Sequence, residues 1–527
     1  MTGLGHQIGI QRNKKGLMKH FFIYLSIILL MGCSNEDPPQ FEFSDRQIEI
    51  IEEHTSGFPD NTQLSISIIE NLNTNFYGII VKDDGLKYIE NKDSVFEIGS
   101  LTKLFTSAML ADLLLDEKID LDDEIDPYLP FKLHEIEQKY DAITFRTLAN
   151  HTSGLPRMPD NYAYYPESSH DARAYSLETL QEYLESDLEL ISNPGEDYIY
   201  SNLGYGILGY LVSLFTKRDY EKLLQKVICR PYRMYNTTTE INKIRSLLVS
   251  GKDKNGNTID NYDLGILGPS GGAFSNISDL TNFIQTNFNE DALLTLQREE
   301  TYGWGNFGVA LGWHILKIGG SNCEWYFHSG GMEGYRSSVY MDTRSKRAVI
   351  VLSNVSTFHP NSNNIDQLAY DLLKNEYMGD ENNDHCIAPF IELAIEKGWG
   401  ANKRDSLELM RFPDHSIYGV WRQVNKNRHI TRTFFPDNKV QTNFQGDDQI
   451  DVWGFYNLDQ DRIIFNDIGG AACVPEGLYT FTIRNDTLSF QEIQDQCDGR
   501  KTSLLNKWVR QTNPEFSDAS IISLKDN

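Results

Sequence analysis

Two residues one helical turn apart, Ser100 and Lys103, could together form an activated nucleophile. The stretch from Leu101 to Leu115 is apolar on most faces, which predicts a buried helix that starts at or near the serine. Residues three apart share a helix face, so Lys103 can lie against the Ser100 hydroxyl. Burial would lower the pKa of the lysine and allow it to accept the serine proton. The alternative is a serine that caps the helix, followed by an ordinary lysine.

Two further segments carry side chains that could serve the same reaction. Tyr200 and Asn202 lie in a YSN segment before an apolar, glycine-containing helical stretch. A phenol near the lysine could relay protons, and the Asn202 amide could donate to a substrate carbonyl. His328 ends a strand-like run and opens a glycine turn that includes Gly330, where a substrate could approach the strand edge closely. Each segment alone is more typical of packing than of catalysis.

In this order and spacing, the three segments resemble the SxxK, YxN and K/HxG motifs of the serine β-lactamase and penicillin-binding-protein superfamily. The YxN form is similar to the branch of class C β-lactamases, D-alanyl-D-alanine carboxypeptidases and esterases. Three shorter stretches look like the family too: His151–Leu155, Leu121–Asp123, and Gly271–Ser275 with Asp279. The resemblance covers about residues 45–375. It implies an α/β (α+β) domain with an antiparallel sheet flanked by helices, an all-helical subdomain, and the site between them.

The resemblance also implies a role for each residue of these motifs. Ser100 would be the acylated nucleophile, and Lys103 and Tyr200 would form a proton-transfer pair that titrates as a coupled unit. The backbone N–H groups of Ser100 and Gly331 would form the oxyanion hole. The residues expected to bind substrate are Asn202, His328 and Gly330.

The third motif departs from the β-lactamase pattern, because the chain has HSG where class A and class C β-lactamases usually have KTG. A lysine supplies a fixed positive charge for a substrate carboxylate, and the largely neutral His328 supplies less. HxG occurs in related D-aminopeptidases, D,D-peptidases and esterases. No candidate for the deacylating glutamate of class A enzymes follows the YSN segment. We therefore expect slow or absent turnover of β-lactams.

Two other catalytic patterns compete with this one. Gly268–Gly272 matches the GxSxG nucleophile elbow of α/β-hydrolases, which needs a buried strand before it and a helix directly after it. The next helix is predicted only at about Ser278, so a glycine turn near the site is the preferred interpretation. HExxH is absent and the twelve histidines are scattered, so we expect no metal and no cofactor.

The N-terminal residues predict export. Residues 21–32 form an apolar run of twelve after a basic segment, which is too short for a spanning helix and typical of a secretory signal. The run ends in LMGC, which resembles a lipobox, so Cys33 would become the lipidated first residue and anchor the protein to a bacterial membrane, facing the periplasm or the cell surface. An uncleaved hydrophobic anchor is the alternative. The formal net charge of −27 disfavours nucleic-acid partners.

Composition divides the chain into six parts: a signal peptide (1–32), a tether (33–42), the hydrolase domain (43–375), a helical linker (376–414), a small antiparallel β-barrel or sandwich (415–510) and a tail (511–527). The β module resembles small lipocalin-like modules. Cys473 and Cys497 lie within it, and we pair them as a hypothesis. Five cysteines remain besides Cys33, so at least one thiol should be free or paired outside the chain.

The sequence thus predicts an exported serine hydrolase that forms an acyl-enzyme at Ser100. Its substrates would be small molecules or peptides, with peptidoglycan fragments among the candidates: amides that contain D-residues, or esters. Two alternatives stay open: a penicillin-binding D-alanyl-D-alanine carboxypeptidase or weak class C-like β-lactamase, and a relative that binds peptidoglycan without turnover. The oligomeric state is left undetermined.

Overall fold

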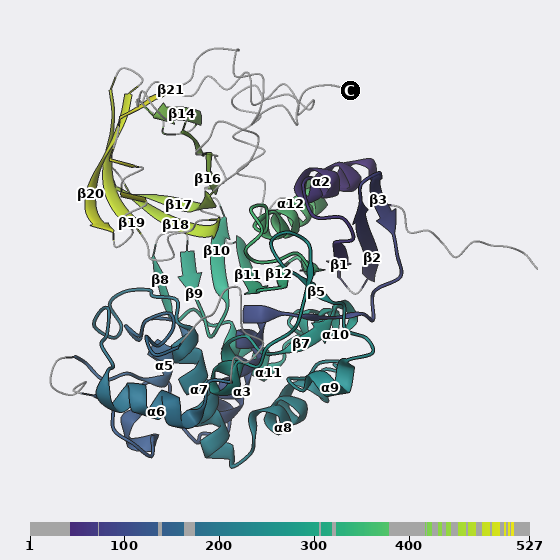
Figure 1. Ribbon diagram of the computed structural model, residues 1–527. Coiled ribbons are helices and arrows are strands. Elements are labelled where there is room, and N and C mark those ends of the chain that lie inside the picture. The colour runs from purple at the N-terminus through teal and green to yellow at the C-terminus, as the bar shows by residue number, and fades with distance from the viewer. Residues whose placement is uncertain are drawn as a thin grey trace, which may run out of the picture. The chain divides into compact units, whose positions relative to one another are not determined.

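The computed structural model describes residues 43–378 except 72, 135–139, 163–173, 305–306 and 319–322. Between residues 417 and 510 it describes the strands of a second unit and a few residues beside them. Figure 1 shows the arrangement of these elements. In the part of the chain described, no helix is long and apolar enough to cross a bilayer.

A nine-stranded antiparallel sheet is the framework of the first unit, with the strand order β3-β2-β1-β13-β12-β11-β10-β9-β8. Its strands are β1 (Gln63–Glu70), β2 (Asn73–Lys82), β3 (Gly85–Tyr88), β8 (Tyr302–Trp304), β9 (Phe307–Val309), β10 (His314–Ile318), β11 (Cys323–Met332), β12 (Tyr335–Asp342) and β13 (Arg347–Ser353). The central strand β13, RAVIVLS, is buried along its whole length. An unbroken apolar run of this kind is expected where both faces of a sheet are covered.

The two faces of the sheet are covered by different helices. Successive side chains of a strand point to opposite faces. On β12, Val339 belongs to the cluster that includes α3 (Thr102–Leu115) and α10 (Ile277–Thr286), whereas the ring of Tyr340 packs against Tyr370 of α12 (Asn364–Met378). Helix α2 (Asp45–Thr55) lies beside α12, and His54 contacts Asp371 there at 2.8 Å. The sequence therefore builds the expected helix–sheet–helix arrangement.

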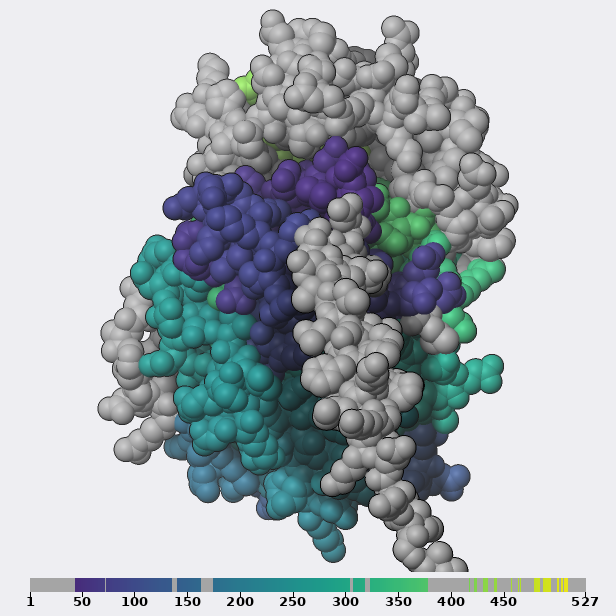
Figure 2. Space-filling view, turned by 90° about the vertical axis from the view of Figure 1, so that its right-hand side faces the viewer, coloured from purple at the N-terminus to yellow at the C-terminus, as the bar shows by residue number. Residues whose placement is uncertain are grey.

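The N-terminal elements also form part of the domain surface. Figure 2 shows the purple surface of α2 and β1–β3 adjoining the teal surface of the middle of the chain. Strand β1 joins these N-terminal elements to the rest of the sheet, because it pairs antiparallel with β13 from Leu64↔Ser353 to Glu70↔Arg347.

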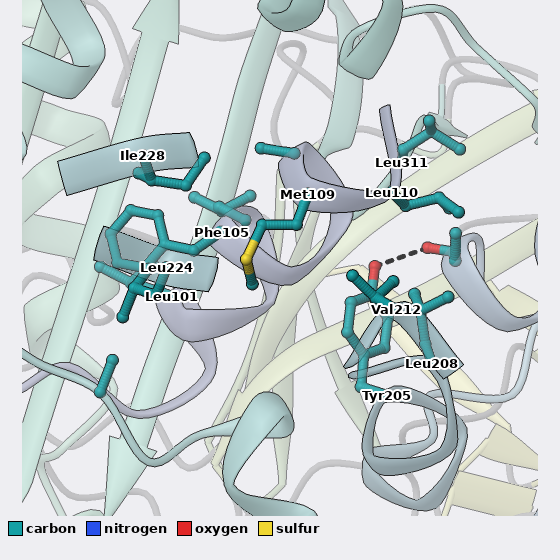
Figure 3. Packing of buried hydrophobic residues seen from close by; sticks show 14 of the residues in the cluster. Leu101, Phe105, Met109, Leu110, Tyr205, Leu208, Val212, Leu224, Ile228 and Leu311 are labelled. Carbon is teal, nitrogen blue, oxygen red and sulfur yellow. Dashed lines mark hydrogen bonds between the residues drawn. The ribbon is translucent and has the colours of Figure 1, made fainter. Parts of the chain in front are cut away.

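The helical subdomain packs around α3. It includes α5 (Phe145–Ala149), α6 (Leu177–Ser186), α7 (Asn202–Thr216) and α8 (Tyr220–Leu224). Figure 3 shows Leu224 and Ile228 on one side of α3, with Leu208 and Val212 of α7 on the other. Most residues of α3 are buried. The helix is thus enclosed by its neighbours, which explains why the sequence has apolar residues on most of its faces. Burial of this helix fixes the position of the residues at its N-terminal end.

The second unit is a closed antiparallel barrel, one of the two forms that the sequence left open. Its eight strands are β14 (Gly419–Gln423), β15 (Thr431–Phe434), β16 (Lys439–Asn443), β17 (Val452–Asp459), β18 (Arg462–Gly470), β19 (Gly477–Arg484), β20 (Thr487–Asp495) and β21 (Trp508–Arg510). Pairing of β14 with β21 closes the barrel. Aromatic residues such as Trp421, Tyr456 and Trp508 fill its interior. The lipocalin-like resemblance stays a prediction, as do the domain boundaries at residues 375 and 415.

The cysteines are described only in part. Cys229 is free and buried, in line with the expected odd thiol. Cys323 is disulfide-bonded, and its partner lies outside the described residues. The predicted pair Cys473–Cys497, the signal segment and Cys33 also lie outside them, so these stay predictions.

Candidate active site

Ser100 lies in a tight turn before α3. The turn, Gly99–Leu101, is a 3₁₀ helix, and α3 proper begins at Thr102, one residue later than the sequence indicated. Gly99 has φ +51°, and a Cβ on it would lie 2.6 Å from the Gly331 backbone nitrogen. Glycine is therefore needed here for both its backbone conformation and its small size. Ser100 is partly exposed, as a group that meets substrate must be.

Lys103 is fully buried, and its amino group is surrounded by oxygen atoms. Its Nζ lies 2.7 Å from Asn202 Oδ1, 2.7 Å from the Ser270 carbonyl oxygen and 3.2 Å from Ser100 Oγ. Burial, with the nearby charge of Arg157, lowers the pKa of Lys103 well below its usual value. A neutral amine has two N–H donors, which match the two close acceptors. Its lone pair is left for the serine proton.

Tyr200 lies against both residues of the first motif. Its ring centre is 4.7 Å from Lys103 Nζ, and its hydroxyl hydrogen-bonds to Ser100. Burial raises the pKa of Tyr200 to about 12, although Arg157 and the bond to Ser100 act in the opposite direction. Tyr200 is therefore a neutral phenol at pH 7. The ring of His151 stacks on it at 4.3 Å.

Helix α7 begins at the second motif, which explains why Asn202 reaches the lysine. Ser201 is the N-cap of the helix, and its hydroxyl accepts a bond from the Gly204 N–H at 2.8 Å. The Ser201 N–H donates to His151 Nδ1 at 3.1 Å, which ties this segment to the HTSGL stretch. These local bonds place Asn202 at the first turn of the helix, facing Lys103.

Strand β11 places the third motif beside the serine. Met332 pairs with Tyr335 across a two-residue turn. In an antiparallel pair every second residue directs its backbone N–H and C=O groups to the partner strand, so Gly330 and His328 direct theirs to β12. The N–H of Gly331 points the other way, to an edge that β10 no longer covers because β10 starts opposite Phe327. Gly99, the residue before Ser100, lies against the Gly331 backbone, so the two N–H groups of the predicted oxyanion hole belong to neighbouring segments.

His328 is buried and neutral. Burial, with the charges of neighbouring groups, lowers its pKa well below the usual range for histidine. Its Nδ1 lies 2.8 Å from the Ser329 carbonyl oxygen, to which a protonated Nδ1 donates. A fixed positive charge, which the lysine of KTG would supply, is therefore lacking at this position.

His314 was not singled out from the sequence, yet it lies within the same cluster of rings. Its ring centre is 5.0 Å from that of His328, and its Nε2 lies 2.6 Å from the Tyr198 hydroxyl. Burial lowers the pKa of His314 to about 3. With His151 it completes a group of three neutral histidines around Tyr200. Only the contact of distant segments brings them together, so no local pattern could have shown it.

The GxSxG segment serves the site in another way. Ser270 is the last residue of a 3₁₀ helix, Gly265–Ser270, and its hydroxyl donates to the Leu267 carbonyl at 2.7 Å. It is not held at a strand–helix elbow. Its carbonyl oxygen is one of the two close acceptors for Lys103. The glycine turn expected near the site is thus present, and its contribution is a backbone carbonyl.

The residues described contain no group of three or more His, Cys, Asp and Glu side chains arranged to hold a metal ion. The arrangement of Ser100, Lys103, Tyr200 and Asn202 instead provides a hydroxyl, a base, a proton donor and an amide within one cluster. Such a set can perform acyl transfer without a metal.

Comparison with known proteins identifies relatives of the first unit. The model of the Beta-lactamase family matches residues 77–374. Protein flp of Staphylococcus aureus is 26% identical over 331 residues, which cover 60% of this chain and 64% of that protein. The D-alanyl-D-alanine-carboxypeptidase/endopeptidase AmpH of Escherichia coli is 33% identical over 202 residues, 38% of this chain and 50% of AmpH. The chain therefore spans less than two thirds of the length of these relatives.

Solved structures show the same fold. A β-lactamase/D-alanine carboxypeptidase from Yersinia pestis has a TM-score of 0.52 and 21% identity, covering 62% of this chain and 99% of that one. The octameric penicillin-binding protein homologue from Pyrococcus abyssi has a TM-score of 0.52 and 17% identity, with 88% and 99% covered.

Proposed function

The chain belongs to the Beta-lactamase family, and we propose that it is a serine hydrolase that works through an acyl-enzyme at Ser100. The observation that carries the proposal is the environment of Lys103. Its buried amino group has two close carbonyl acceptors and the Ser100 hydroxyl as its third neighbour, 3.2 Å away. A base with a lowered pKa beside a hydroxyl is what a weak nucleophile needs.

The proposed reaction has two steps. Ser100 Oγ attacks the substrate carbonyl while Lys103 takes the serine proton, and the N–H groups of Ser100 and Gly331 bind the oxyanion. The proton passes through Tyr200 to the leaving nitrogen or oxygen, and the bond to the leaving group breaks. Water then attacks the acyl-enzyme with the same groups as bases, which releases the acid and restores the hydroxyl. Asn202 would orient the substrate.

The preferred substrates are amides or peptides with D-residues, or esters. The neutral, buried His328 supports this choice over β-lactams, because a cation for the β-lactam carboxylate is missing at this position. The similarity to AmpH, a D-alanyl-D-alanine-carboxypeptidase/endopeptidase, favours a D-alanyl-D-alanine carboxypeptidase as the second candidate. Peptidoglycan-derived peptides would fit either activity.

The first experiment is the intact mass of the chain from Ser34 after incubation with benzylpenicillin, beside Ser100→Ala. A persistent penicilloyl adduct on the wild type alone supports the carboxypeptidase. Intact penicillin and no adduct, with fluorophosphonate labelling that Ser100→Ala abolishes, supports an amidase or esterase. A protein that neither reagent modifies would contradict the hydrolase and leave the peptidoglycan-binding alternative.

We also propose export and lipid anchoring at Cys33, on the strength of the basic segment, the apolar run and the LMGC sequence before it. In cells, the wild type should incorporate an alkynyl fatty acid and partition into detergent. Cys33→Ser should do neither. Equal labelling of both proteins would contradict lipidation at this cysteine.

A further inference from the structure

Arg157 places an exposed positive charge at the candidate active site. It follows the HTSGLP stretch, and its side chain is exposed. Its guanidinium carbon lies 5.0 Å from the centre of the Tyr200 ring. Among the residues that the structure describes, no carboxylate forms an ion pair with it. The guanidinium donors are therefore available to a ligand that reaches Tyr200.

The backbone of Arg157 is held in place independently of its side chain. Its carbonyl oxygen accepts bonds from the N–H groups of Asn202, at 2.9 Å, and Leu203, at 3.2 Å. These two N–H groups belong to the first turn of α7, which has no helical acceptors for them. A substitution at position 157 therefore changes the side chain without removing this anchor.

The other positively charged side chains near the serine are already engaged. Arg336 forms an ion pair with Asp366, whose side chain is fully buried, and bonds to Thr357 Oγ1 at 3.4 Å. Lys103 is buried with carbonyl partners, and His328 is neutral. Within the described residues of the site, Arg157 is thus the cation best placed to meet an anionic group of the substrate.

We propose that Arg157 binds the carboxylate of the leaving amino acid, which makes peptides with a free C-terminal carboxylate the preferred substrates. This rests on the proposed function, in which Tyr200 passes the proton to the leaving nitrogen. In a C-terminal amino acid, the carboxylate carbon lies about 2.5 Å from that nitrogen. A guanidinium over the Tyr200 ring is therefore on the side of the leaving group. Its planar fork matches a carboxylate with two parallel hydrogen bonds.

The reaction balances without any further reagent. The bond between Ser100 Oγ and the acyl carbon forms, the C–N bond breaks, and the nitrogen takes the proton that left the serine. The free amino acid departs with its carboxylate unchanged, and Arg157 transfers no proton. Water then hydrolyses the ester at Ser100. Arg157 is thus a specificity-determining residue that touches the substrate and leaves the proton pathway to Lys103 and Tyr200.

The test compares two substrates that differ only at the C-terminus: an N-acylated D-alanyl-D-alanine with a free carboxylate, and the same peptide as a C-terminal amide. The readout is the ratio of their kcat/KM values. We expect the wild type to favour the carboxylate by about 10- to 100-fold, the range of a hydrogen-bonded charge. Arg157→Gln should reduce the ratio to about one, and Arg157→Glu should reverse it.

Arg218→Gln is the matched control, because it removes the same charge from an exposed site just beyond the far end of α7. That end of the fifteen-residue helix is about 22 Å from its start. The control should keep the wild-type ratio. A wild-type ratio near one, or an unchanged ratio in Arg157→Gln, would overturn the inference.

Fluorophosphonate labelling and hydrolysis of a neutral ester separate this inference from the proposed function. If Ser100 labels and the ester is hydrolysed but neither peptide is, the hydrolase stands and the role of Arg157 is wrong. If Ser100 does not label and nothing is hydrolysed, the proposed function fails and the inference fails with it.

Discussion

The amino group of Lys103 illustrates how burial favours the neutral form of an amine, the form that the proposed base needs. The enclosing residues make its protonated form costly, while two carbonyl oxygens satisfy the two N–H groups of the neutral form. Tyr200 is affected in the opposite sense by the same burial, since its neutral form is the protonated one. The same burial thus favours the free amine at Lys103 and the protonated phenol at Tyr200.

This pair of protonation states predicts how activity depends on pH. Activity on a neutral ester should fall as the pH drops through the lowered pKa of Lys103, because the lysine becomes protonated. It should not decline on the alkaline side until the pH nears the Tyr200 pKa of about 12.

Lys103→Met should lose about 10²- to 10⁴-fold in kcat/KM, the usual contribution of a general base. A pH profile of Lys103→Met that still shows the wild-type acid limb would contradict this assignment.

The same burial predicts how stability depends on pH. The unfolded lysine binds a proton below about pH 10.4, and the folded one does not down to its lowered pKa. At this side chain the unfolded state therefore holds more protons in this window, so the contribution of Lys103 to the free energy of unfolding rises with pH. Urea unfolding at pH 8 and pH 9 should show the free energy of unfolding of the wild type rising relative to that of Lys103→Met, by at most about 1.4 kcal/mol per pH unit. No change, or a loss, would show that the folded lysine is charged.

At the scale of elements, the site depends on close contact between the turn before α3 and the edge of β11. Gly99 has a positive φ, and its Cα faces the Gly331 nitrogen. Gly99→Ala should strain the turn and displace that amide, which would cost about 10²- to 10³-fold in the rate of Ser100 labelling. Gly85→Ala is the control: Gly85 also has a positive φ, but a Cβ there meets no atom within 4 Å. Equal labelling of both variants would contradict this account.

The sequence anticipated elements better than contacts between them. The sequence predicted the helix that ends at Leu115 and the proximity of Ser100 to Lys103. Both follow from the spacing of residues that are close together in the chain. The 3₁₀ turn at Gly99, the ring of His314 and the guanidinium of Arg157 depend on segments that meet only in the folded domain. A single sequence contains no periodic pattern that reports contacts between distant segments. It therefore could not predict the turn, the histidine ring or the guanidinium at the site.

At the scale of the whole molecule, the two units have separate cores. One cluster of buried residues runs from Ile69 to Leu352, and the other, from Ile417 to Trp508, contains only residues of the barrel. Because neither of these two clusters includes a described residue of the other unit, we expect a chain of residues 34–414 to melt cooperatively. It should also label at Ser100 within about twofold of the rate of the longer chain. Loss of cooperative melting or of labelling would show that the barrel is needed for the fold.

The short turn that joins Ser100 to Lys103 has a consequence for how such a protein diversifies. The proposed nucleophile and base are three residues apart in one helical turn, whereas Arg157 and His328 belong to a loop and a strand edge distant from that turn in the sequence. Substitutions in the loop or at the strand edge can change the preferred substrate while the reactive pair keeps its geometry. New selectivity is therefore within reach of single mutations that leave the spacing of Ser100 and Lys103 unchanged.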